Sequence, residues 1–437
     1  MTCRFRAASA ALATALCCGA AAEAQTQTPA WGRFALFLQG SRQVQDTGLS
    51  TNMSDVIGNL TIRSASNDDG GFEYAIDARG ANYTGAFEQR EVSVYDAYVG
   101  YRAAGGGFGL RLGQMWLNDL GSLGSVAGAL VEYRAHEQSA AGRFRLGLFA
   151  GAEPDTFQAG LVNGVRKTGG YVALDGDLGR RHVLGFVTIK NQGLTEREVA
   201  TTLNFVPVGR RFFLYQAAEY DLKGPGGTAN KGLNYMFVNL RWAPTDVFDF
   251  QGTYHHGLSV DARTITNDEL QGKPVDPRLV TGFLFESAGG RLTVNLLRRL
   301  RVWAGYYNDR NNVDSSATGR VSAGLWAGNI LGSGLDLMVS DNRWNRTGSR
   351  FDSWYTSLGA SLSRAVYLSV DYTTSLSILS FTSTGGVVVE SRPETKRYSF
   401  SSTINVSRAL SLLLTAERFL EDTGHEDRAM AGFVLRF

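Results

Sequence analysis

The sequence predicts an all-β chain that closes into one antiparallel transmembrane β-barrel, and three observations support this prediction. Strand-length segments alternate between apolar and polar residues, which is the period of a strand with two different faces. The breaks between these segments alternate between short turns and longer loops, as they do when turns and loops lie on opposite sides of a membrane. The composition is uniform, with 52 Gly, only 8 Pro and 11% aromatic residues among 437, so one large unit is favoured over several domains.

The first residues predict a secretory signal peptide over residues 1–24. A basic region is followed by an apolar stretch and by the small-x-small cleavage site Ala22-Glu23-Ala24. The alternative is an N-terminal anchor helix, but the apolar run is short for crossing a bilayer. Cleavage would leave a short periplasmic segment, residues 25–31, before a single barrel domain, residues 32–437. All three cysteines lie inside the signal, so the mature chain would be held by its hydrogen-bond ladder and apolar contacts alone.

Three segments show the strand alternation most clearly. Residues 72–79 place Phe, Tyr, Ile and Ala opposite Glu, Ala, Asp and Arg. Residues 142–148 place two arginines opposite Phe and Leu, and residues 396–406 collect Tyr, Phe, Ile and Val on one face. Helical spacing explains none of these patterns.

The breaks predict how the strands are joined. Short breaks rich in Gly, Asn, Asp and Pro fit tight periplasmic turns, and longer breaks fit extracellular loops. The best count is 22 strands, with about 18 to 22 acceptable because residues 183–208 could hide a mis-split hairpin. An even number is what an antiparallel barrel with both termini in the periplasm requires. The longer breaks are residues 118–127, 152–168, 224–231, 261–286, 313–319, 382–394 and 422–427.

The alternatives to a membrane barrel are the soluble all-β folds. A sandwich also alternates, but its turns do not sort by length and one sandwich rarely grows this large. A propeller would repeat a motif at a period of roughly 40 to 50 residues, and the sequence shows none. A β-solenoid is the third alternative. The membrane barrel accounts for more of the pattern than any of them.

The last ten residues carry a first resemblance. From Ala429 the apolar residues Ala431, Phe433, Leu435 and Phe437 share one face, and the chain ends on the aromatic. This end resembles the C-terminal signal of bacterial outer-membrane β-barrels. The resemblance implies that Phe433, Leu435 and Phe437 close the barrel and present an assembly signal to the barrel-assembly machinery.

A hairpin carries a second resemblance. Ala97-Tyr-Val-Gly100, a Gly-rich turn and Leu110-Arg-Leu-Gly-Gln114 resemble the strand-turn-strand of bacterial porins. In porins the loop after this hairpin folds into the pore and constricts it. Here that loop, residues 118–127, is short and carries Asp119 as its single acid. We therefore expect the longest loop, residues 261–286, to narrow the lumen instead.

Assigning the aromatic and aliphatic residues to lipid leaves the opposite face of each strand for the lumen. A barrel of this size is too wide for side chains alone to fill, so water should fill it and inward charges should act on solutes. More arginines than acids among these positions predict a mild anion preference, although a charged wet wall is ordinary in any barrel. The pore-lining candidates are Arg79, Arg102, Arg111, Glu132, Arg134, Arg143, Arg145, Arg241, Asp249 and Arg397.

Other functional classes find little support. His255 and His256 are adjacent on a strand and point to opposite faces, and no histidine spacing fits zinc, so we expect no metal and no cofactor. No Gly-x-Ser-x-Gly motif is present, and we expect no enzyme activity. A net charge of +2 does not suggest nucleic acid.

The expected function is a porin-like channel of a Gram-negative outer membrane that lets small hydrophilic solutes diffuse passively. The expected partners are membrane lipid, lipopolysaccharide and those solutes, and the porin resemblance implies a homotrimer. Two alternatives stay open: a structural or interaction barrel whose lumen is occluded by residues 261–286, and a channel dedicated to one solute.

Overall fold

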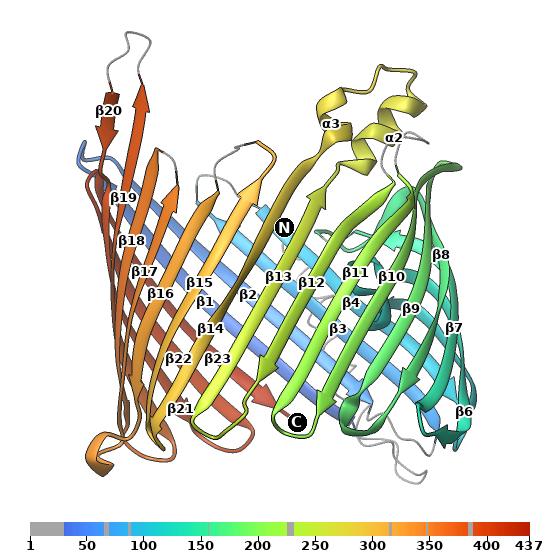
Figure 1. Cartoon of the computed structure of the whole chain (residues 1–437), viewed down its shortest axis with the longest axis horizontal. Helices are drawn as coiled ribbons and strands as arrows, with labels where there is room; N and C mark the ends of the chain where they lie inside the picture. Colours follow the sequence, from blue (N-terminus) through green and yellow to red (C-terminus); the bar gives the residue numbers. More distant parts are fainter. Residues whose placement is uncertain are drawn as a thin grey trace, which may run out of the picture.

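The computed structural model describes residues 30–64, 70–85, 89–155, 157–224, 231–313, 317–346, 348–382 and 388–437. Within these residues one antiparallel sheet closes on itself as a barrel (Figure 1). The predicted signal peptide, residues 1–24, lies outside the described residues. The barrel begins at Ala30, two residues before the predicted start of the domain.

The ring holds 22 strands, and this confirms the best count from the sequence. Along the ring each strand pairs with the next one in the chain, with a single exception among the described residues. β20 lies outside the ring and pairs with the last residues of β19, so β19 is joined directly to β21. The first eleven strands are β1 (Ala30–Gln45), β2 (Ser50–Ser64), β3 (Gly71–Thr84), β4 (Gln89–Arg102), β5 (Gly107–Trp116), β6 (Ser125–Ser139), β7 (Gly142–Pro154), β8 (Leu161–Asp175), β9 (Arg181–Asn191), β10 (Leu194–Val208) and β11 (Phe212–Lys223). The others are β12 (Gly232–Trp242), β13 (Phe248–Ser259), β14 (Phe283–Leu297), β15 (Leu300–Asn311), β16 (Thr318–Ala327), β17 (Leu335–Arg346), β18 (Ser349–Ser361), β19 (Val366–Thr382), β20 (Val388–Ser391), β21 (Glu394–Asn405), β22 (Leu410–Glu421) and β23 (Gly424–Arg436).

Helices are few and short among the described residues. Two α-helices, α2 (Ala262–Leu270) and α3 (Pro277–Thr281), stand at the rim between β13 and β14 (Figure 1). Three 3-10 segments are η1 (Asn118–Leu123), η2 (Asp177–Gly179) and η3 (Ile330–Gly332). None of the helices in this part of the chain has the length and apolar character needed to cross a membrane.

The last strand closes the ring against the first. β23 pairs with β1 from Arg33↔Arg436 to Gln45↔Gly424, and Gly32 and Phe437 exchange two backbone hydrogen bonds of 2.6 and 3.0 Å. Gly32 is needed here, because a Cβ at this position would lie 2.2 Å from the Phe437 ring. The rings of Phe34 and Phe433 also meet across this seam at 5.8 Å.

The two faces of the sheet differ as the alternation predicts. One face carries large apolar side chains that are widely exposed on the isolated chain, such as Phe72 at 73%, Phe108 at 67% and Leu148 at 60%. The other face carries ion pairs and contacts the η1 segment, so it is the inside of the cylinder. An apolar exterior over a polar interior is the inverse of a soluble fold and fits a surface that meets lipid.

Two sequence expectations about connections are settled by the strand bounds. Residues 183–208 do contain a hairpin break, a two-residue turn at Gln192 and Gly193 between β9 and β10. The predicted longer break at residues 422–427 is wrong, since β22 runs to Glu421 and β23 starts at Gly424. Its polar residues are strand residues near the rim, where water replaces lipid and the apolar alternation is not required.

Candidate functional site

The segment after β5 turns into the barrel instead of continuing the wall. β5 ends at Trp116 after 10 residues, η1 follows, and β6 begins at Ser125. The backbone N–H of Leu117 donates to the carbonyl of Gly124 at 2.8 Å and closes the excursion. Glycine is required at 124, because a Cβ there would lie 2.1 Å from the Leu117 carbonyl oxygen. The short loop that we did not expect to narrow the lumen therefore lies inside it.

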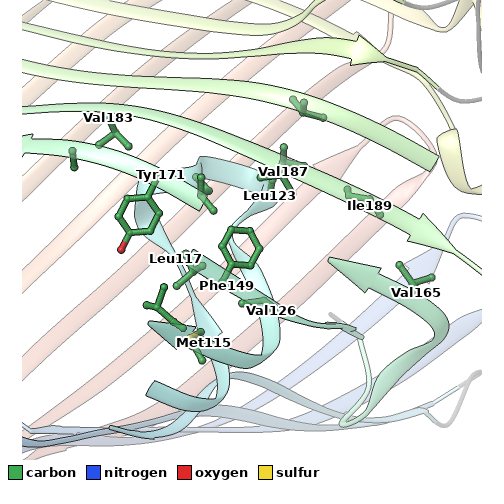
Figure 2. Close-up of a cluster of buried hydrophobic side chains, with 14 residues drawn as sticks. Met115, Leu117, Leu123, Val126, Phe149, Val165, Tyr171, Val183, Val187 and Ile189 are labelled. Carbon is green, nitrogen blue, oxygen red and sulfur yellow. The ribbon is translucent and has the colours of Figure 1, made fainter. Parts of the chain in front are cut away.

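Apolar packing fixes η1 to the wall of β6 to β10. Leu120 is 1% exposed, and the inward side chains of Val126, Val187 and Val199 are completely buried in the same cluster. Figure 2 shows side chains of this cluster gathered between the η1 segment and the strands. Small residues make room for it, since a Cβ on Gly185 would lie 2.4 Å from Leu120. The lumen is thus filled on this side by a dry core of the kind found in soluble domains.

Arg145 on β7 ties the polar end of η1 to the same wall. Its guanidinium lies 2.5 Å from Asp119 of η1, 3.0 Å from Glu132 on β6 and 2.9 Å from Asp175 on β8. Tyr171 donates its hydroxyl to Glu132 at 2.5 Å. The Arg145 side chain is only 6% exposed. A planar guanidinium with five donors suits such a shared, buried position.

The ion pairs continue around the wall toward β2. Arg102 lies 2.9 Å and Arg111 2.8 Å from opposite oxygens of Glu73, and Arg102 and Arg134 lie 3.7 and 3.5 Å from Glu132. Arg63 on β2 bonds Asp96 on β4 at 2.6 Å. Each arginine of this network lies within 4 Å of one of its carboxylates. We call it the charged wall, with the residues Arg63, Glu73, Asp96, Arg102, Arg111, Asp119, Glu132, Arg134, Arg145, Asp175 and Arg181.

A stripe of rings lies on the inner face of β11 to β14. Centroid distances are 6.0 Å for Tyr215–Phe237, 6.4 Å for Phe237–His255, 5.7 Å for Tyr235–His255 and 5.7 Å for His255–Phe285. The register pairs Phe237 with Ala217 and Tyr235 with Glu219, so these rings share the face of Glu219. We call these five residues the aromatic stripe.

A cavity of about 500 Å³ separates η1 from the aromatic stripe. One side is formed by η1 through Leu120, Gly121 and Ser122, and the other by rings that include Tyr235 and His255. Its charged lining residues are Asp119, Arg197 and Glu219. A volume in this range matches ordinary small-molecule sites.

The loop between β13 and β14 is bonded to the upper wall beside this cavity. Arg263 of α2 lies 2.7 Å from Glu196 and 2.9 Å from Glu153, and the Asn191 amide donates to Asn267 at 2.9 Å. Asp261 caps α2 by accepting from the backbone N–H of Thr264 at 3.0 Å. This backbone bond, together with the Thr264 hydroxyl, lowers the pKa of Asp261 below its ordinary value of 3.8.

The predicted pore-lining residues fall into two groups. Arg102, Arg111, Glu132, Arg134 and Arg145 belong to the charged wall, and Arg143 is half-buried at its β7 end, opposite Asp175. The others lie elsewhere around the ring: Arg241 bonds Asp249 at 2.5 Å, Arg397 bonds Glu417, and Arg79 donates to the Tyr83 hydroxyl at 3.3 Å. Their role in solute passage stays a prediction.

The sequence reasoning missed two features of this site. Glu73 lies opposite Phe72 in a faultless alternation, so the parity that placed Arg79 inward also placed Glu73 there. The aromatic stripe was missed because aromatic residues were assigned to lipid as a class. The pairing of Tyr235 with Glu219 on one face is the signal that contradicts this assignment.

Comparison with known proteins finds similarity to solved structures and to no family model or curated sequence. No protein-family model matches the chain, and no curated protein matches it. Solved structures similar to the chain include Acinetobacter baumannii OccAB2 (TM-score 0.46, 8% identity, covering 95% of this chain and 100% of that one) and OccAB4 (0.42, 9%, 94% and 99%). Pseudomonas aeruginosa OpdQ is similar with a TM-score of 0.41 and 10% identity over 93% and 97% of the two chains.

The architecture predicted from the alternation and from the breaks between segments, a closed antiparallel barrel of 22 strands like that of porin-like outer-membrane proteins, is confirmed by the structure itself.

Proposed function

We propose that this protein is an outer-membrane channel through which small hydrophilic solutes diffuse passively. The observation that carries the proposal is the reversal of polarity across the sheet: exposed apolar side chains outside, ion pairs inside. A closed sheet of 22 strands is too wide for its own side chains to fill, and the part that η1 fills lies against β6 to β10 only. The remaining lumen is then a route for water and solutes.

The cellular setting follows from the same fold. Barrels of this kind occupy outer membranes, so lipid and lipopolysaccharide surround the apolar face. We propose export through the signal peptide over residues 1–24 and assembly through the C-terminal strand, with Phe433, Leu435 and Phe437 as the signal to the assembly machinery. A homotrimer remains a proposal that rests on the porin resemblance.

Charge selectivity should be weak. The expected anion preference rests on the arginines, but the six arginines of the charged wall bond five carboxylates that offset most of their charge. Arg79 and Arg291 bond the neutral partners Tyr83 and Gln251, and their charges support a residual preference for anions. A reversal potential in a salt gradient would measure it, and we expect a shift of a few millivolts toward anion selectivity.

Single-channel recording tests the channel itself. Purified, refolded protein in a planar bilayer should give discrete conductance steps in simple salt. Absence of steps at every voltage, from protein shown to be folded by circular dichroism, would remove the channel and favour the occluded barrel. The Arg263 tether of α2 is the observation that favours this second candidate, because it holds the loop against the upper wall.

A further inference from the structure

The cavity between η1 and the aromatic stripe has a composition of its own. We propose that it is a binding subsite for an organic cation, a solute that carries an ammonium group on a flat apolar body. The proposal rests on the proposed function, since it names a class of solute that the channel would hold on its way through the lumen.

The rings supply the first half of the site. Tyr235, His255 and Phe285 line the cavity, and their neighbours along the stripe keep them at centroid distances of 5.7 to 6.4 Å. Aromatic faces carry negative electrostatic potential and attract a cation within about 6 Å of the ring centre. The same faces accept the apolar body of the solute by stacking.

The charges supply the second half. Arg197 lies 2.8 Å from Asp221 and 3.9 Å from Glu219, so two carboxylates share one guanidinium. Asp119, the other acid of the lining, is bonded by Arg145 and Arg181 and is therefore neutralised. The side of the cavity next to the stripe keeps one negative charge in excess.

Glu219 is placed to present that charge. Its side chain is 9% exposed, lines the cavity, and accepts a hydrogen bond from Ser122 of η1. Asp221 lies behind it and is held by Arg197 and Asn234. A buried carboxylate with an incomplete ion pair is costly unless a cation approaches it.

The test compares three probes of one shape and different charge. Isothermal titration of the detergent-solubilised full chain with benzyltrimethylammonium, benzyl alcohol and benzoate measures binding without requiring conduction. We expect saturable binding of the cation and at least tenfold weaker binding of the neutral and anionic probes. Equal affinity for all three, or preference for benzoate, would overturn the proposal.

Variants locate the site. Glu219→Gln should weaken binding of the cation about tenfold, and Phe285→Leu by a factor of about 3. Glu426→Gln is the matched control, because Glu426 is an ion-paired acid (2.7 Å from Arg428) at the β23 side of the ring. It should leave the affinity unchanged, and all variants should keep the far-UV circular dichroism of the parent. Equal binding by Glu219→Gln and the parent would also overturn the proposal.

Single-channel recording, combined with the binding titration, separates this proposal from the proposed function. Conductance steps without binding of any cation would leave the channel and remove the subsite. Cation binding that depends on Glu219, in protein that shows no steps, would leave the subsite and remove the channel.

Discussion

The charged wall, on β2 to β9, and the aromatic stripe, on β11 to β14, lie on the inner face of one barrel, and they are built in opposite ways. The charged wall is coupled to η1 by a buried core around Leu120 and by the shared guanidinium of Arg145. The aromatic stripe is separated from η1 by a cavity of about 500 Å³. The charged wall is therefore packed against η1, whereas the aromatic stripe borders the cavity.

The comparison shows that an inward-facing charge in this barrel can have a structural role. Arginines of the charged wall are bonded to carboxylates on neighbouring strands, so their first role is to hold η1 and the strands together. A list of inward arginines predicted from parity does not distinguish this role from solute selection. Mutations on the two sides should therefore have different effects, and the following predictions are ordered by size.

The largest effect is expected for Arg145→Ala. It removes the cation shared by the buried carboxylates of Asp119 and Glu132 and the partly exposed carboxylate of Asp175, and breaking a buried pair in this way costs about 3–5 kcal/mol. Urea unfolding in detergent, followed by tryptophan fluorescence, measures the loss. Arg241→Ala is the control, because its pair with Asp249 is half-exposed and should cost under about 1 kcal/mol. Similar losses for both variants would contradict the special role of the charged wall.

The next effect is expected for Leu120→Ala. Truncating a buried leucine costs at least about 2 kcal/mol, and here the loss falls on the attachment of η1. η1 should detach from β8 to β10 while the ring stays closed, so single-channel conductance should rise. Leu178→Ala is the control, because Leu178 lies in the exposed segment η2. It should change neither the stability nor the conductance. An unchanged conductance in Leu120→Ala would show that η1 does not restrict the lumen.

A smaller effect is expected for the cap of α2. Asp261→Ala removes the carboxylate that accepts from the Thr264 backbone, a loss of about 1 kcal/mol for helix α2. Hydrogen exchange of the α2 amides should quicken by about fivefold, which is that energy expressed as a rate ratio. Amides of the β13 ladder should be unaffected.

The same carboxyl predicts a pH dependence. Its pKa is lowered by the bonds from Thr264, so its contribution is fully present above the ordinary value of 3.8 and is lost as the pH falls through the folded value. Protection of α2 should therefore be constant above about pH 4 and drop as the pH falls below it, after correction for intrinsic exchange. The drop should be smaller in Asp261→Asn, and an equal drop in both would assign it to other acids such as Glu196.

The smallest effect on stability is expected in the aromatic stripe. Tyr235→Leu removes a ring that meets His255 edge-on, and the loss should be about 0.5 kcal/mol. Urea unfolding measures it in the same series as Arg145→Ala. A loss as large as that of Arg145→Ala would show that the stripe is structural after all.

Much of the fold could be predicted from sequence because a barrel has a simple repeat. Alternation in residues 72–79 and 142–148 set the faces, and breaks such as residues 224–231 set the strand ends. Pairing of β23 with β1 followed from the apolar last strand. The exact end of β22 could not be predicted, because the rim residues there no longer follow the apolar pattern.

The site was predicted less well for a physical reason. Parity identifies a face but not which residues on distant strands come together, and η1 brings Asp119 to Arg145 by a turn that only Gly124 permits. The inward rings contradict the rule that aromatics face lipid, and recognising them needs the strand register. Interior packing against η1 is a tertiary feature with no local pattern.

The central claim is that one face of every strand meets water inside a closed cylinder while the other meets lipid. Single cysteines along β13, in a chain with Cys3, Cys17 and Cys18 replaced by serine, test it most directly. In liposomes, a membrane-impermeant maleimide should label cysteines at Gln251 and Thr253, which pair with the inward residues Arg241 and Asn239, and should spare those at Phe250 and Gly252. Equal labelling at all four positions, or labelling of Phe250 and Gly252 alone, would contradict it.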